Sequence, residues 1–156
     1  MICFHNPDEE NGYLSNWYLS DFTIDGITFS SMEQYMMYKK AVLFHDDEAA
    51  VRISQTNDVA EIKALGRSVK NFEEKLWREV RTEIVHRGVF AKFDQNPELA
   101  GLLKQTGEDT IAECAVKDRI WGIGLSMKDE NRFCADRWRG QNLLGKILMQ
   151  IRSEIS

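Results

Sequence analysis

The sequence has few cysteines, histidines and prolines, and it lacks a long apolar run. Its three cysteines, Cys3, Cys114 and Cys134, are scattered and odd in number, which favours reduced thiols over a disulfide framework. Neither the cysteines nor the three histidines show the close spacing of zinc ligands, so we expect no metal and no cofactor. No apolar run approaches membrane-spanning length, and the N-terminal segment holds neither a basic leader nor a signal-length apolar stretch. We therefore expect a cytoplasmic protein without a membrane partner.

Positive charge is also scarce. The 156 residues carry a net charge of −5 and the pI is near 5.3, which argues against broad attraction to nucleic-acid phosphates. Arg132, Arg137 and Arg139 nevertheless surround Trp138. A solvated charged loop is the simpler interpretation of this segment, and a local basic pocket is the alternative. The length is that of one domain and no stretch resembles a linker, so we expect a single domain over residues 1–156.

The pattern of apolar residues predicts short strands and several helices. Residues 22–29 alternate around Asp25-Gly26, which predicts a hairpin with a type I′ turn. Ser30 and Glu33 match a capping box, so a helix should run to about Phe44. Further strands are expected at residues 2–5 and 110–116, and helices at about 57–66, 71–92, 96–107 and from 142 onward. The sum is an α+β fold, a mainly helical single domain around a few short strands.

The first helix places a carboxylate and an amine on one face. Glu33 and Lys40 lie seven residues apart, so they differ by about 20° around the helix axis and stand about 10.5 Å apart along it. Both side chains can therefore reach one small molecule that lies across the helix. The structural alternatives are that Glu33 belongs to the Ser30 capping box and that Lys40 extends from an apolar face to solvent.

A glycine-rich segment follows the strand at 110–116. Asp118, Trp121 and Gly122 could offer a flat ring and a polar contact to a base, although no lysine follows as in a P-loop. A turn anchored by a core tryptophan is the alternative.

The last helix opens with a second glycine-rich segment. Gly140, Asn142 and Gly145 surround its start, where free N–H groups and the helix dipole suit a phosphate. Gly145 would allow either a ligand or a neighbouring backbone to come close. Ordinary capping by Asn142 is the alternative.

Seven short motifs follow one another along nearly the whole chain. They are N-G-Y-L-S-N-W at 11–17; D-G at 25–26 with F-S-S-M-E-Q-Y at 29–35 and Lys40; G-R at 66–67; K-F-D-Q-N at 92–96; L-L with T-G at 102–107; Glu113 with D-R-I-W-G-I-G at 118–124; and G-Q-N-L-L-G at 140–145 with Arg152. In this order they resemble the YbiA-like, or NADAR (NAD and ADP-ribose), family. Gln34 departs from the family pattern, in which many members have histidine, and the segment 125–139 varies within the family.

The resemblance implies an N-glycosidase that separates a ribose phosphate, or ADP-ribose, from an exocyclic amine of a base. Such substrates include riboflavin-pathway ribosylamino-pyrimidine phosphates and ADP-ribosylated guanine, so the partners would be small molecules or ADP-ribosylated nucleic acid. It also implies that Glu33 and Lys40 are catalytic. The residues expected to bind substrate are Asn16, Arg67, Glu113, Asp118, Trp121, Gly122, Gly140, Asn142 and Gly145.

Two mechanisms are compatible with these residues. A neutral Lys40 could attack the ring-opened sugar and form an imine while Glu33 moves protons. Alternatively, Glu33 could activate a water molecule for direct hydrolysis. A different class of function, a non-catalytic module that binds ADP-ribose or NAD, would keep the Trp121 segment and would not need the ionisation of Glu33 or Lys40.

Overall fold

The computed structural model describes residues 1–155, and the chain forms two compact units. One unit comprises residues 1–18 and the chain from Asn96 onward, and the other comprises residues 19–95. Within the described residues there are six α-helices and four strands of three residues each, with short 3-10 helices between them. The α+β, mainly helical prediction is therefore confirmed. The prediction of one domain over residues 1–156 stays a prediction.

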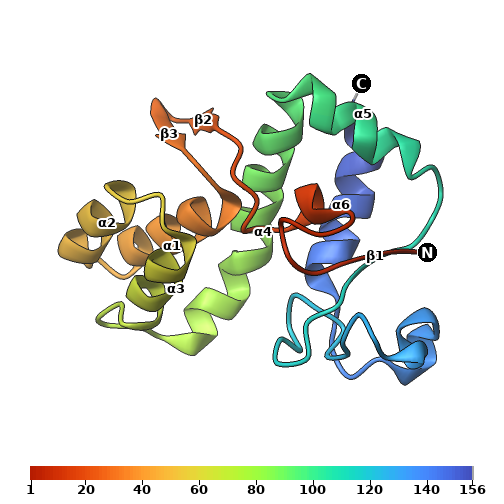
Figure 1. Cartoon of the computed structure of the whole chain (residues 1–156). Coiled ribbons are helices and arrows are strands. Elements are labelled where there is room, and N and C mark those ends of the chain that lie inside the picture. Colours follow the sequence, from red (N-terminus) through yellow and green to blue (C-terminus); the bar gives the residue numbers. More distant parts are fainter. Residues whose placement is uncertain (156) are drawn as a thin grey trace. The chain divides into compact units, whose positions relative to one another are not determined.

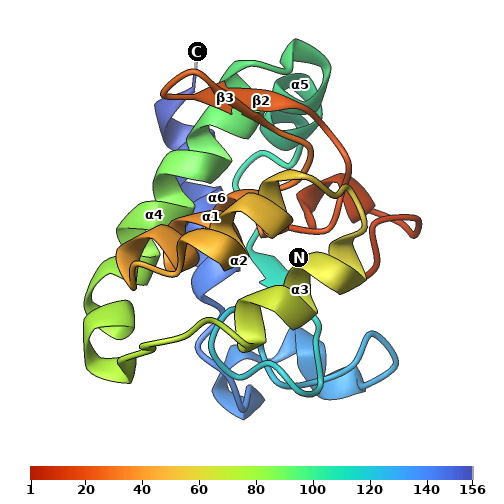
Figure 2. The same ribbon diagram turned by 90° about the vertical axis from the view of Figure 1, so that its left-hand side faces the viewer.

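In the unit 19–95, helix α1 packs against three other helices. The elements are β2 (Phe22–Ile24), β3 (Ile27–Phe29), α1 (Met32–Leu43), α2 (Asp47–Ser54), α3 (Val59–Arg67) and α4 (Glu74–Asp94). Helix α1 contacts α2, α3 and α4, as Figures 1 and 2 show. Its first six residues, 32–37, are all buried. A helix buried on all sides must satisfy its polar side chains within the protein.

The hairpin forms as predicted. Strands β2 and β3 pair antiparallel, and Asp25 and Gly26 have φ values of 53° and 79°, the left-handed backbone that a type I′ turn requires. The hairpin packs on α1 through Phe29, whose ring centroid lies 5.1 Å from that of Tyr35. The contact between these two aromatic rings thus holds the end of β3 against the first turns of α1.

The cap of α1 differs from the predicted one by one residue. The N-cap is Ser31, whose Oγ accepts from the N–H of Gln34 at 3.1 Å. Gln34 Oε1 reaches back to the N–H of Ser30 at 2.7 Å, so Gln34 takes the position in the capping box that was assigned to Glu33. The register is shifted because Ser30 ends the hairpin and Ser31 has extended backbone. Glu33 is therefore not needed for capping.

One helix was not predicted, and the boundaries of two others differ from the predictions. Helix α2 was not predicted, although Asp46 caps it and acidic residues open it. Helix α3 continues through Gly66 and ends at Arg67. Helix α4 begins at Glu74, since Asn71 has a φ of 60° that a helix does not allow.

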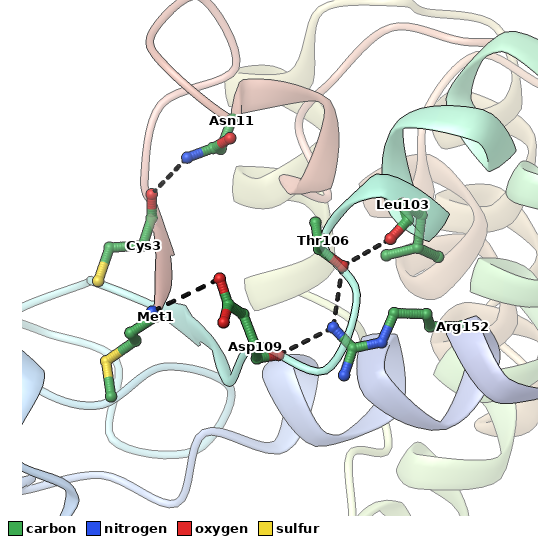
Figure 3. Close-up of polar contacts among 7 residues, drawn as sticks. All are labelled: Met1, Cys3, Asn11, Leu103, Thr106, Asp109 and Arg152. Atoms are coloured by element: carbon green, nitrogen blue, oxygen red, sulfur yellow. Dashed lines mark hydrogen bonds and ion pairs between the residues drawn. The ribbon is translucent and has the colours of Figure 1, made fainter.

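In the other unit, a parallel strand pair packs with the last helix. Strand β1 (Ile2–Phe4) pairs with β4 (Ile111–Glu113), and both are shorter than predicted. The helices are α5 (Pro97–Gln105) and α6 (Leu143–Glu154), with a 3-10 turn, η1 (Gly12–Leu14), near the N-terminus. Arg152 of α6 donates to the Thr106 hydroxyl at 2.9 Å and to the Asp109 carbonyl at 2.8 Å, which ties α6 to the loop before β4 (Figure 3).

Residues 114–142, between β4 and α6, hold no α-helix or strand. Two 3-10 turns, η2 (Glu130–Phe133) and η3 (Ala135–Arg137), lie within this segment. Trp138 is half-buried and its indole N–H donates to the Arg132 carbonyl at 2.8 Å. Arg137 and Arg139 are exposed, which agrees with a solvated charged loop.

Gln34→Ala is expected to lower the free energy of unfolding by about 1–3 kcal/mol. The Gln34 side chain is 3% exposed, and its amide donates to the carbonyls of Ile53 at 3.0 Å and Thr56 at 2.9 Å. Removal of the amide leaves these acceptors without their donor. Urea denaturation measures the change, and the exposed Gln55→Ala in the same unit is the control. Equal effects of the two substitutions would contradict this prediction.

Candidate active site

The predicted site residues fall into two groups. Glu33, Lys40 and Arg67 belong to the unit 19–95. The other unit holds Asn16, Glu113, Asp118, Trp121, Gly122, Gly140, Asn142 and Gly145.

Glu33 and Lys40 lie on α1 and interact electrostatically. Glu33, in the first turn, is only 6% exposed, and Lys40, in the last turn, is half-buried. The charge of Glu33 acts on the pKa of Lys40, so the two groups are close enough to influence each other. Because Gln34 completes the cap of α1, the cap does not require the buried Glu33 carboxylate.

The surroundings of the Lys40 amine are partly apolar. Its Nζ lies 4.6 Å from the centroid of the Phe72 ring and 5.9 Å from that of Trp77. It donates to the Gly66 carbonyl at 2.8 Å. Burial lowers the pKa of Lys40 below its ordinary value, whereas the Glu33 carboxylate opposes this effect and raises it.

This arrangement can produce a nucleophilic amine. A lysine reacts through its neutral form, and the lowered pKa increases the neutral fraction at a given pH. A neutral Lys40 amine can still donate one N–H to the Gly66 carbonyl, which leaves its lone pair free to attack. Glu33 is a carboxylate on the same helix that can accept or supply a proton. The alternative role of Lys40 is structural, since Gly66 lies in the last turn of α3, where carbonyls lack helical partners.

Gly66 permits the close approach of α3 to α1. A Cβ atom on Gly66 would overlap Sδ of Met37 and lie 2.7 Å from its Cγ. The absence of a side chain at Gly66 thus leaves the space that the Met37 side chain occupies between the two helices. The next residue, Arg67, is exposed and places a guanidinium at the end of α3.

The Asp118–Gly124 segment forms a turn held by its own aspartate. Asp118 Oδ1 accepts from the N–H groups of Ile120 at 3.0 Å and Trp121 at 2.9 Å. Trp121 is half-buried, so the residue is not fully enclosed in the core. Gly122 lies against the backbone, because a Cβ there would come 2.9 Å from the Glu113 carbonyl oxygen. Asp118 thus shapes the turn that presents Trp121.

The start of α6 is occupied by protein groups, contrary to the predicted phosphate site. The N–H groups of Leu143 and Leu144 donate to the carbonyls of Ile120 and Trp121, each at 3.1 Å, and that of Asn142 donates to the Gly122 carbonyl at 3.0 Å. These donors are not open to a phosphate. Direct phosphate binding by the first N–H groups of α6 is therefore not supported.

Asn142 does not cap α6 with its side chain either. It is buried, with a φ of 53°, and its amide spans to β4: Oδ1 accepts from the N–H of Glu113 at 3.1 Å and Nδ2 donates to the Ile111 carbonyl at 2.9 Å. A Cβ on Gly145 would overlap the Ile111 carbonyl oxygen, and one on Gly140 would overlap that of Gly122. Of the two alternatives for Gly145, close approach of a neighbouring backbone is the one observed.

Two further predicted residues lie in the same unit. Asn16 is buried just after η1. Glu113 ends β4 and is half-buried. Its backbone N–H is bound by Asn142 and its carbonyl accepts from the N–H of Ile123 at 2.8 Å. Strand β4 is thus joined both to the Trp121 segment and to the start of α6.

Lys92 is a titratable residue whose burial was not predicted from the sequence. It lies in α4 and is 1% exposed, and burial lowers its pKa to about 7. Its Nζ lies 5.3 Å from the Phe93 ring centroid. The only sequence signal was a lysine between Ala91 and Phe93 in an otherwise apolar part of the helix.

Two other properties bear on partners. Over residues 1–155, no three or more His, Cys, Asp or Glu side chains are grouped so that they could hold a metal ion. None of the helices in the described part of the chain is long and apolar enough to cross a membrane.

Comparison with known proteins gives consistent matches over the whole chain. A family model described as the NADAR domain matches residues 3–156. An N-glycosidase of Acanthamoeba polyphaga mimivirus is 38% identical over 98% of this chain and 95% of its own length. A riboflavin biosynthesis protein of Vibrio vulnificus is 32% identical over 99% of this chain, which corresponds to 38% of that protein. The NMR structure of the Escherichia coli protein YbiA, 26% identical, superposes with a TM-score of 0.81 over 98% of this chain and 83% of YbiA.

Lys92→Met is expected to reduce the pH dependence of stability. Between pH 7 and 10.5 the unfolded chain carries one more proton on Lys92 than the folded chain. The free energy of unfolding should therefore rise with pH in this window, by up to about 1.4 kcal/mol per pH unit from this group. Urea denaturation at several pH values measures the slope. Lys75→Met, at an exposed position on the same helix, should leave the slope unchanged. Identical slopes in the wild type and Lys92→Met would contradict the prediction.

Proposed function

The chain belongs to the NADAR domain family, and we propose that its substrate joins a ribose phosphate, or ADP-ribose, to an exocyclic amine of a base. Its reaction is the hydrolysis of an N-glycosyl bond, the activity named for relatives that align with nearly the whole chain. Riboflavin biosynthesis appears in the name of a further relative, which favours a ribosylamino-pyrimidine phosphate as one candidate. ADP-ribosylated guanine is the other. The three free cysteines support the proposed cytoplasmic location.

The observation that carries this proposal is the environment of Lys40. Its amine has a pKa lowered by burial, lies beside two aromatic rings and shares α1 with the buried carboxylate Glu33. A lysine with a lowered pKa suits an imine mechanism, and an exocyclic amino-glycoside can open its sugar ring to give the carbon that an amine attacks.

The proposed reaction proceeds in three steps. First, Glu33 as the acid assists opening of the ribose ring, which leaves an imine between C1 of the sugar and the nitrogen of the base. Second, the Lys40 amine adds to C1, its protons pass to the nitrogen of the base, and the base leaves as a neutral amine while a lysine imine forms. Third, water adds to this imine and releases the sugar, with Glu33 transferring the protons. The simpler alternative is that Glu33 activates water for direct attack on C1.

The remaining residues are proposed to hold the substrate or to shape the binding segments. Trp121 is suited to stacking on a base or ribose because it is an aromatic residue that is only half-buried. Arg67 offers an exposed positive charge to a phosphate. Asn16 and Glu113 are proposed as further polar contacts. Asp118, Gly122, Gly140, Asn142 and Gly145 contribute by fixing the backbone around Trp121 and the start of α6, as their hydrogen bonds and close approaches support.

Glu33→Gln is expected to lower kcat by about 10²–10⁴-fold, because an amide cannot transfer a proton at neutral pH. The cap of α1 depends on Ser31 and Gln34, so the free energy of unfolding should change little. Turnover of a ribosylamino-pyrimidine phosphate and of ADP-ribosylated guanine is measured together with urea denaturation. The exposed Glu48→Gln is the control. A fully active Glu33→Gln protein would remove Glu33 from the mechanism.

Borohydride added during turnover is expected to fix the sugar phosphate to Lys40. Reduction of the lysine imine gives a stable secondary amine, which peptide mass spectrometry locates. Lys40→Arg should abolish both turnover and trapping, because a guanidinium stays protonated and cannot form an imine. Lys92, with its pKa of about 7, and Lys146, which is exposed, serve as internal controls for nonspecific modification.

The outcomes distinguish the proposed alternatives. Normal turnover by Lys40→Arg without trapping would exclude the imine and leave water activated by Glu33. Sugar fixed to Lys92 in place of Lys40 would show that the nucleophile lies on α4 and that the assignment to Lys40 is wrong. Tight binding of ADP-ribose without turnover of either substrate would favour the non-catalytic module.

A further inference from the structure

Cys3 and Cys114 lie close together on two paired strands. The parallel register pairs Cys3 of β1 with Ala112 of β4, and Cys114 follows two residues after Ala112. Alternate residues of a strand point to the same face, so Cys3, Ala112 and Cys114 share one face. They belong to one buried cluster with Ile123 and Leu125. Cys3 is 8% exposed and Cys114 is 1% exposed.

The two thiols lie close enough for each to act on the pKa of the other. The Cys114 thiol also donates to the Ala112 carbonyl at 3.9 Å. Cys114 occupies the end of the strand pair, where its N–H donates to the Phe4 carbonyl at 2.8 Å and β4 has already ended at Glu113. Cys114 lies diagonally from Cys3 in the register, so a bond between the sulfurs requires a shift of the backbone at this end of the strand pair.

Arg132 supplies positive charge next to Cys3. The hydrogen bond from Cys114 and the charge of the Arg132 guanidinium lower the pKa of Cys3 to about 7, although burial opposes them. The Nε atom of Arg132 is buried and has no hydrogen-bond partner in residues 1–155, so a donor is available for an anionic sulfur. Positive charge and a hydrogen-bond donor beside a sulfur favour its thiolate, which is the form that reacts with oxidants.

We propose that Cys3 and Cys114 form a reversible modification site at which a hydroperoxide oxidises the two thiols to a disulfide. The Cys3 thiolate attacks the peroxide oxygen and becomes a sulfenic acid, while the peroxide is reduced and leaves as an alkoxide or hydroxide that takes up a proton. The Cys114 thiol then attacks the Cys3 sulfur, hydroxide leaves, and the proton of Cys114 joins it to form water. Two electrons pass from the thiols to the peroxide, and a thiol reductant reverses the change. This site does not depend on the glycosidase reaction.

The position of Cys114 connects the site with the Trp121 segment. Cys114 directly follows Glu113, whose N–H is held by Asn142, and Ile123 of the same cluster donates its N–H to the Glu113 carbonyl at 2.8 Å. A disulfide would pull the end of β4 toward β1. The backbone that presents Trp121 starts at this point.

The test begins with the full chain, fully reduced, in which the exposed Cys134 is replaced by Cys134→Ser to prevent links between molecules. One equivalent of hydrogen peroxide is added, free thiols are blocked with N-ethylmaleimide after denaturation, and the protein is mapped by mass spectrometry. The expected result is the loss of both thiols together, with the mass of two hydrogens removed and a peptide pair linked through Cys3 and Cys114. Dithiothreitol should restore both thiols.

Matched variants test the roles of the surrounding groups. Arg132→Gln should slow the oxidation several-fold, whereas Arg137→Gln, at an exposed arginine of the same segment, should not. In Cys114→Ser a sulfenic acid at Cys3 should accumulate and react with dimedone. Should a variant fail to fold, the wild-type chain gives the same mapping, with Cys134 followed separately. Oxidation of Cys3 to a sulfinic acid while Cys114 remains a thiol, or two thiols that stay reduced under peroxide, would overturn the proposal.

Discussion

The burial of the first half of α1 is the constraint on which the unit 19–95 depends. Residues 32–37 are all buried, so each polar group there needs a partner inside the protein. Gln34 meets this need by joining the Ser30 N–H to the carbonyls of Ile53 and Thr56, which fixes the end of α2 and the start of the next loop against α1. Because Gln34 performs this structural task, the neighbouring Glu33 is not needed for capping, and its buried carboxylate is the one that the proposed mechanism uses.

The second unit depends on close backbone contacts at the start of α6. Asn142 adopts a left-handed φ, which turns its amide toward Ile111 and Glu113 of β4. Carbonyl groups of the Trp121 segment accept the first N–H groups of α6, and glycines at 122, 140 and 145 allow these backbones to touch. The glycine-rich motifs therefore describe packing between three chain segments. A phosphate at this helix terminus would need the same N–H groups, and those of Leu143 and Leu144 already donate to carbonyls of the chain.

The sequence was most informative where a local pattern alone determines the structure. Asp25-Gly26 predicts its turn because few residues adopt two successive positive φ angles. Two adjacent serines, in contrast, do not reveal which of them caps α1, since either satisfies the pattern and only the position of the hairpin decides. The burial of Lys92 and the placement of Cys3 and Cys114 in one buried cluster arise from tertiary packing, and no local pattern predicts them. The sequence predicts that Glu33 and Lys40 lie on one face of a helix. It does not predict that Lys40 donates a hydrogen bond to the Gly66 carbonyl.

Access to solvent separates the two lysines whose pKa values are lowered by burial. Lys92 is nearly inaccessible, so its neutral amine is shielded from any substrate. Lys40 is only half-buried, and the Glu33 carboxylate favours its protonated form and so opposes the lowering of its pKa by burial. An imine-forming lysine needs this balance: it must lose a proton to attack, yet remain accessible and be held in one orientation. The Gly66 carbonyl supplies the orientation in both protonation states, because an ammonium and a neutral amine can each donate an N–H to it.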